Sequence, residues 1–195
     1  MKFSNSKRMR FKKLDRDSPF RFVLVFLTLF LVFYYFNLLF FGISTPGHFY
    51  NAFLADHLNY ISWLRYFLLH SSAQILNWLG FTAITSDYEL LVVGRGTIKL
   101  VYSCLGLGVI SFFSAFVLAY PKKPKAKWLF IISGILLIQV LNILRFVLLA
   151  LYWNQQDGII LDHHTIFNIT MYIIIAISLY FWVTHDDKNR IATTN

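Results

Sequence analysis

The sequence has little charge and a single cysteine, and both shortages narrow the class of protein that it can encode. Charged residues make up 14% of its 195 positions, whereas hydrophobic residues make up 57%. A soluble domain carries about 25% charged residues, because its surface faces water. The single cysteine excludes an internal disulfide and a Cys-rich metal site within this chain. The apolar residues also fall in long runs, so we expect a polytopic membrane protein.

Acidic residues are scarce as well, since the chain has 9 of them against 18 lysines and arginines, for a net charge of +9. The basic excess is concentrated before residue 22 and between residues 122 and 127. Nucleic-acid binding is the alternative explanation for such clusters. Beside apolar helices, however, basic clusters typically mark cytoplasmic segments. We therefore expect membrane lipid, and no nucleic acid, among the partners.

The apolar runs predict a single membrane-embedded domain over residues 20–184, between a basic cytoplasmic tail at 1–19 and a polar cytoplasmic tail at 185–195. A helix of about 20 apolar residues is long enough to cross a bilayer. No small-residue cleavage site follows the first run, which therefore predicts a retained anchor. The expected spanning helices cover residues 20–41, 105–120, 128–153 and 165–183.

Residues 48–81 break this pattern, because polar side chains such as Asp56, Asn59 and Arg65 interrupt an aromatic, helix-prone segment. Its apolar residues recur at roughly helical spacing, which is typical of an amphipathic helix at a membrane surface. With both basic clusters inside, an even number of spans must separate them, and helices 20–41 and 105–120 already supply two. A spanning helix at 57–80 is the alternative. We favour a helix that lies at the outer interface.

Residues 82–101 differ from both the apolar runs and the segment 48–81, because two β-prone runs flank Gly94-Arg95-Gly96. The runs are residues 88–93 and 97–101, and a Gly-rich turn between them predicts a β-hairpin. The hairpin should lie outside the membrane and lead the chain to Cys104. The expected fold is thus an all-α polytopic membrane protein with about four transmembrane helices, an interfacial amphipathic helix and a short extracytoplasmic β-hairpin.

Cys104 stands where the hairpin gives way to an apolar helix that runs inward. The partial positive charge at the N-terminus of that helix would favour the thiolate over the thiol, and a thiolate is a nucleophile. The alternative interpretation is that a lone cysteine is a small buried hydrophobic residue.

Arg145 lies within the apolar run 128–153, with Asn142 one helical turn before it on the same face. An arginine inside the membrane costs at least a few kcal/mol unless it is paired or reaches water, so it marks a functional site or a structural pair. A pairing with backbone carbonyls or with Asp162 is the structural alternative. Asn142 is expected either to bond to Arg145 or to shape the site.

His163 and His164 follow Asp162 just before the last spanning helix, and an imidazole can act as a base toward a thiol. Ordinary loop histidines are the alternative. Neighbouring residues rarely chelate one ion well, so we expect no metal and no cofactor. Under the charge-derived topology, the thiol, the guanidinium and the imidazole all lie toward the outer leaflet. A thiolate would attack a peptide carbonyl, the histidine would protonate the leaving amine, and Arg145 would stabilise the oxyanion.

These three motifs resemble those of the exosortase/archaeosortase family. The resemblance covers residues 85–180, and the segments that carry it are Ser103-Cys104-Leu105-Gly106, Asn142-Ile143-Leu144-Arg145 and His163-His164-Thr165-Ile166-Phe167-Asn168. It implies that Cys104 is the nucleophile, that Arg145 is the arginine of the Asn-x-x-Arg motif and that His164 is the catalytic histidine. His163, Asn142 and Gly106 would support them. Leu105 departs from the small or polar residue that usually follows the nucleophile.

The resemblance also implies an activity. Members are integral membrane cysteine enzymes that cleave C-terminal sorting tails of exported proteins and transfer the new carboxyl group to an amine, glycan or lipid acceptor. A short bacterial member would lie in the cytoplasmic (inner) membrane with its active site facing outside. Two other functions remain open on the residues alone: a non-enzymatic scaffold for surface polysaccharide or protein export, and a lipid-binding transport protein in which Arg145 grips a phosphate.

Overall fold

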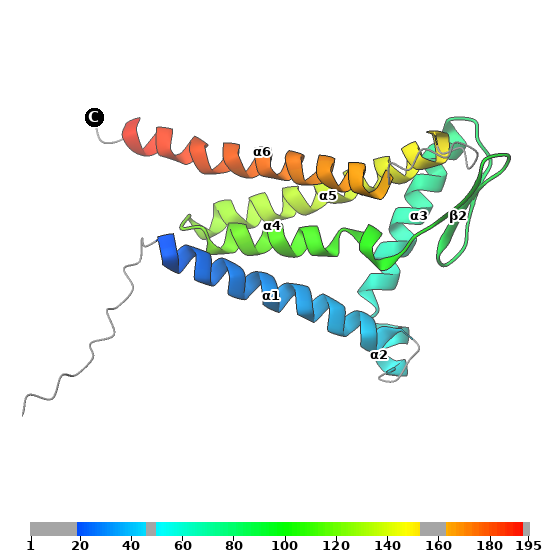
Figure 1. The fold of residues 1–195 in the computed structure, drawn as a ribbon, viewed down its shortest axis with the longest axis horizontal. Helices are drawn as coiled ribbons and strands as arrows, with labels where there is room; N and C mark the ends of the chain where they lie inside the picture. Colours follow the sequence, from blue (N-terminus) through cyan, green and yellow to red (C-terminus); the bar gives the residue numbers. More distant parts are fainter. Residues whose placement is uncertain (1–18, 46–49, 153–162, 193–195) are drawn as a thin grey trace, which may run out of the picture.

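The computed structural model describes residues 19–45, 50–152 and 163–192, and within the last segment it describes the side chains of residues 167–184. Four helices, which we call the bundle, run side by side (Figure 1). They are α1 (Pro19–Ser44), α4 (Leu107–Ala119), α5 (Pro124–Tyr152) and α6 (His163–Ala192). Helix α1, helix α5 and residues 167–184 of α6 are each long and apolar enough to cross a membrane, and α4 is a shorter apolar helix. The prediction of an all-α polytopic membrane protein is confirmed.

Helix α3 (Tyr60–Trp78) lies across one end of the bundle, beside a small sheet (Figure 1). It follows the short helix α2 (Ala52–His57), and the side chain of Asn59 caps it by accepting a hydrogen bond from the Ser62 backbone N–H. One face of α3 buries Leu68, Leu69 and Leu76. This crosswise arrangement agrees with the predicted interfacial helix and not with a further span. We call this end of the molecule the sheet end.

The sheet contains three antiparallel strands in chain order, namely β1 (Ala83–Thr85), β2 (Glu89–Val92) and β3 (Gly96–Lys99). The predicted hairpin is the β2–β3 pair, in which Leu90 faces Ile98 across the two strands. Strand β1 was not expected, because a segment of three residues is too short to show an alternating pattern. After β3 the chain runs into the turn that carries Cys104, as the sequence predicted.

Helix boundaries differ from the predicted ones at several places; α1 ends at Ser44 and not at residue 41, and α5 begins at Pro124 and not at residue 128. The helix expected from residue 105 begins at Leu107, and Tyr102–Leu105 form a separate 3₁₀ turn, η1. Gly106 separates the two with a left-handed φ of 74°. Helix α6 does not end at residue 183 but continues to Ala192, since polar residues can extend a helix beyond the apolar run that predicted it.

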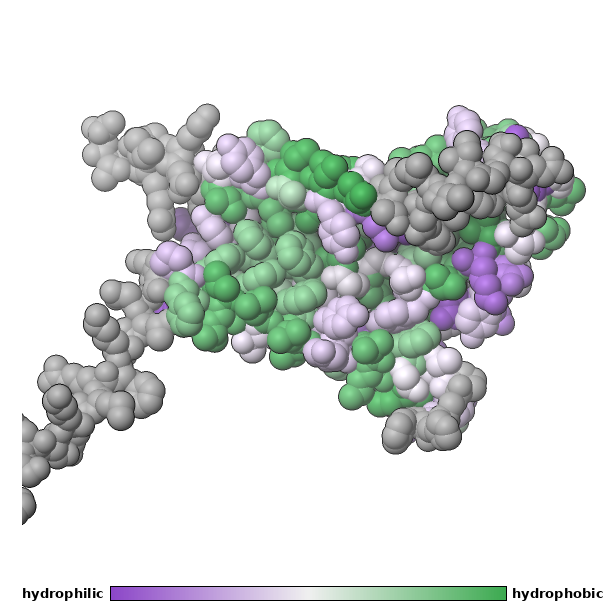
Figure 2. Space-filling model, viewed as in Figure 1, coloured by the Kyte–Doolittle hydropathy of each residue, from purple (hydrophilic) through white to green (hydrophobic). Residues whose placement is uncertain are grey.

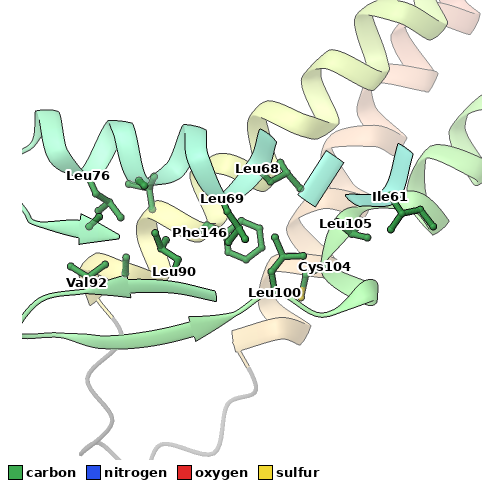
Figure 3. Packing of buried hydrophobic residues seen from close by; sticks show 14 of the residues in the cluster. Ile61, Leu68, Leu69, Leu76, Leu90, Val92, Leu100, Cys104, Leu105 and Phe146 are labelled. Atoms are coloured by element: carbon green, nitrogen blue, oxygen red, sulfur yellow. The ribbon is translucent and has the colours of Figure 1, made fainter. Parts of the chain in front are cut away.

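A hydrophobic core fills the sheet end (Figure 3). Leu69 of α3, Leu90 of β2 and Phe146 of α5 meet there, and Cys104 belongs to the same cluster. A second cluster joins α4, α5 and α6 within the bundle. Helices α4 and α5 approach closely because Gly134 has no side chain where the ring of Phe113 lies.

Helix α1 packs against α4 through aromatic edge-to-face pairs. The ring centroids are 5.3 Å apart for Phe22 and Phe116 and 5.4 Å apart for Phe26 and Phe112. Edge-to-face geometry is a favoured arrangement of aromatic rings, so these pairs stabilise the contact between the two apolar helices. Nearer the sheet end, the Asn37 side-chain amide donates a hydrogen bond to Ser111 Oγ over 3.2 Å. These contacts hold α1 against α4.

Candidate active site

Cys104 lies on η1 between the sheet and α4, with 2% of its surface exposed. Its backbone N–H donates to the Val101 carbonyl over 2.9 Å, which closes the turn. Helix α4 begins at Leu107, three residues after Cys104, so Cys104 precedes the positive end of the helix dipole in the chain.

Arg145 reaches the same place from α5. Its guanidinium Nη2 lies 3.5 Å from Cys104 Sγ, within hydrogen-bonding distance of a sulfur, and Arg145 is 3% exposed. The structure thus brings together two residues that are 41 positions apart in the chain. The structure therefore places a buried positive charge directly beside the thiol of Cys104, in a region from which water is excluded.

Asn142 is 1% exposed, and its side-chain amide donates two hydrogen bonds. One goes to the backbone carbonyl of Leu105 over 3.3 Å, and the other goes to Gln139 Oε1, also over 3.3 Å. Gln139, Asn142 and Arg145 follow one another at intervals of three residues, so they form a buried polar stripe on one face of α5. Sequence reasoning assigned no role to Gln139, although the spacing of these three polar residues in an apolar helix was the available signal.

Gly106 packs directly against the side-chain amide of Asn142. A Cβ atom at position 106 would stand 2.6 Å from Asn142 Nδ2, closer than real contacts allow. Together with the left-handed φ, this contact gives two separate reasons for glycine at this position.

His163 and His164 are the first two residues of α6, and their side chains lie outside the described residues. Phe167, one helical turn after His164, is described, and its ring centroid lies 5.9 Å from Arg145 Cζ. The first part of α6 therefore reaches the region of α5 that carries Arg145. The predicted contact between Cys104 and an imidazole stays a prediction.

The comparison with protein families identifies the family of the chain. It matches the model of the transmembrane exosortase family (Exosortase_EpsH) over residues 9–182. The chain belongs to the transmembrane exosortase family. The comparisons with curated proteins and with solved structures gave no match. The matched region is longer than the motif-bearing part that the sequence resemblance covered, and it takes in α1 and α3 as well.

Two tyrosines of this exosortase-type membrane protein, Tyr60 and Tyr102, pack against the core cluster that contains Cys104. The Tyr60 hydroxyl donates to Asn37 Oδ1 over 2.6 Å, and burial, with Tyr102 nearby, raises the pKa of Tyr60 to about 12. Burial also raises the pKa of Tyr102, and Tyr34 adds to the effect. Both phenols are therefore neutral at ordinary pH, and the Tyr60 phenol acts as a hydrogen-bond donor. Among the described residues, no group of three His, Cys, Asp or Glu side chains is placed to hold a metal ion.

Proposed function

We propose that this chain is a membrane cysteine transpeptidase or protease that recognises and cleaves C-terminal sorting signals of exported proteins. The contact between Arg145 Nη2 and Cys104 Sγ, 3.5 Å apart and buried, supports the proposal most directly. It pairs a candidate nucleophile with the cation that an ionised thiol needs. Membership of the transmembrane exosortase family supports the same class of activity.

In the proposed reaction, the Cys104 thiolate attacks the scissile peptide carbonyl and a carbon–sulfur bond forms. Arg145 stabilises the negative charge first on sulfur and then on the carbonyl oxygen. His164 donates a proton to the departing amine as the carbon–nitrogen bond breaks, which leaves a thioester on Cys104. An amine, glycan or lipid acceptor, or water, then attacks the thioester, gives up a proton to His164, which is thereby restored, and releases the Cys104 thiolate.

The charge distribution supports an active site that faces outside. The lysines at 122–127 lie in the α4–α5 connection and the first turn of α5, at the end of the bundle opposite the sheet, and α1 begins at that end (Figure 1). The N-terminal basic cluster directly precedes α1 in the sequence. Basic segments stay in the cytoplasm, so the sheet end with Cys104 and Arg145 would face outward. In a bacterium, this corresponds to the outer side of the cytoplasmic membrane.

The test compares the C-termini of exported proteins in cells that carry the parent chain and in cells that carry Cys104→Ala. We expect a set of proteins to lose a C-terminal hydrophobic tail with the parent and to retain it with the variant, while both chains accumulate equally in the membrane. Ser103→Ala is the matched control, because Ser103 is the exposed neighbour on the same turn. Identical C-termini in the parent and Cys104→Ala cells would refute the proposal.

A further inference from the structure

We propose that Asn142 is a positioning residue, which holds the turn η1 so that the Cys104 sulfur stays beside the Arg145 guanidinium. The inference rests on the proposed function in taking Cys104 as the nucleophile. It adds a residue that acts through the backbone of Leu105, which is next to Cys104. It also assigns roles to Gly106 and Gln139, which support the contact between Asn142 and Leu105.

Helix α5 holds η1 at two consecutive residues. Arg145 contacts the side chain of Cys104, and Asn142 contacts the backbone carbonyl of Leu105. Asn142 and Arg145 are three residues apart, hence on one face of a rigid helix. A turn tied at both points can neither rotate about its own axis nor slide along α5, so the distance from sulfur to guanidinium is fixed.

Gln139 sets the orientation of the Asn142 amide. The amide group carries two N–H donors, and the bonds to Leu105 and Gln139 engage both of them. Gln139 is itself buried, with 8% of its surface exposed. Buried hydrogen bonds have no competing water, so removal of the Gln139 acceptor frees the amide to turn away from η1.

Gly106 leaves room for the Asn142 side chain beside η1. A Cβ atom there would stand 2.6 Å from Asn142 Nδ2 and 3.3 Å from Ile138 Cγ2, so a larger residue would push the amide off the Leu105 carbonyl. Gly106 and Asn142 therefore contribute to the same contact between η1 and α5.

The experiment uses the fact that Cys104 is the only cysteine in the chain. Membranes that contain the full chain are treated with iodoacetamide over a pH series, and the rate of Cys104 alkylation is measured by mass spectrometry. The pH of half-maximal rate reports the thiolate population, whereas the plateau rate reports access to the thiol. The two quantities separate a change of position from a change of exposure.

We expect Asn142→Ala to raise the pH of half-maximal alkylation by about one unit, which is a roughly tenfold loss of thiolate at neutral pH. Gly106→Ala should shift it in the same direction, and Gln139→Ala should shift it less. The double variant Gly106→Ala/Asn142→Ala should shift it no further than the larger single shift, because both substitutions break the same contact.

Asn37→Ala is the matched control, because it removes the same amide from α1, where Asn37 bonds to Ser111 and Tyr60 and not to the turn. The control should leave the pH of half-maximal alkylation unchanged. The inference fails if Asn142→Ala leaves it unchanged while Arg145→Ala raises it, or if Asn37→Ala raises it equally. If Arg145→Ala has no effect, the proposed pairing of Cys104 with Arg145 fails first. Should Asn142→Ala not accumulate, unshifted profiles for both Gly106→Ala and Gln139→Ala would refute the inference.

Discussion

Side chains pack more closely at the sheet end than between helices α4 and α6 of the bundle. Leu68, Leu90 and Leu105 at the sheet end are all 0% exposed. Between α4 and α6, by contrast, an open apolar groove of about 530 Å³ remains. Figure 2 shows hydrophobic residues over much of the bundle and strongly hydrophilic ones at the sheet end.

The difference follows from the solvent on each side. At the sheet end the alternative to a side-chain contact is water, so the hydrophobic effect closes the gaps. Inside a bilayer the alternative is hydrocarbon, which resembles the side chains themselves, so helices can stay apart at little cost. Cys104 and Arg145 both lie at the closely packed end, where a fixed distance between two side chains can be maintained.

The largest expected effect is at Arg145. If the sheet end carries the chemistry, Arg145→Lys should lower tail cleavage by about 100-fold, because a lysine lacks the planar guanidinium whose Nη2 reaches the sulfur. The measurement is the fraction of cleaved tails at equal amounts of membrane protein. Arg95→Lys is the control at the same end, since Arg95 stacks on Phe81 and donates to the Leu151 carbonyl. Near-normal function in Arg145→Lys would instead favour a simple charge contact with a lipid phosphate.

A pair of leucine truncations tests the difference in packing. Leu68→Ala at the sheet end should lower the free energy of unfolding by about 2–5 kcal/mol, because it leaves a cavity in a closed core. Leu136→Ala on α5 removes the same atoms from a side chain that is 62% exposed toward the membrane, and should change it by about 0.5 kcal/mol or less. Thermal unfolding in one detergent compares the two variants. Equal losses would show that the two regions do not differ.

The smallest expected effect concerns Tyr60, which ties α3 to α1. Tyr60→Phe removes the hydrogen bond to Asn37 and should cost about 0.5–1.5 kcal/mol at neutral pH. The pKa of Tyr60 is about 12 in the folded chain, against about 10 for an unfolded tyrosine. Between these values the unfolded state releases its proton first, so the stability of the parent should fall as pH rises from 10 to 12. Unfolding measured at several pH values should show a shallower fall in Tyr60→Phe, and identical slopes would contradict this assignment.

Much of the fold was predictable because its signals are local. Long apolar runs gave the spanning helices, and the Gly94-Arg95-Gly96 turn gave the β2–β3 pair. Strand β1 escaped prediction, since its three residues gain their conformation from pairing with β2 and not from a pattern of their own. The predicted start of α4 was early, because Gly106 interrupts the helix through its backbone and the apolar pattern does not register that change.

The candidate site was predictable as a set of residue types and only partly as a geometry. Cys104, Arg145 and Asn142 were singled out because each is unusual in an apolar chain. Sequence spacing left open whether Asn142 would bond to Arg145 or shape the site, and the structure shows its amide on the Leu105 carbonyl. That outcome depends on the rotation of α5 about its axis, which packing against α3 and the sheet determines.

The sequence by itself determined that this chain is a multi-pass membrane protein, where its long helices run and which residues are chemically exceptional. Composition and periodicity suffice for these properties, because they depend on residues close together in the chain. Only the tertiary structure decided that α3 lies across the bundle, that Arg145 meets Cys104 and that Gly106 makes room for Asn142. Contacts between residues that are 36 to 41 positions apart depend on how whole helices pack, and no local pattern records that packing.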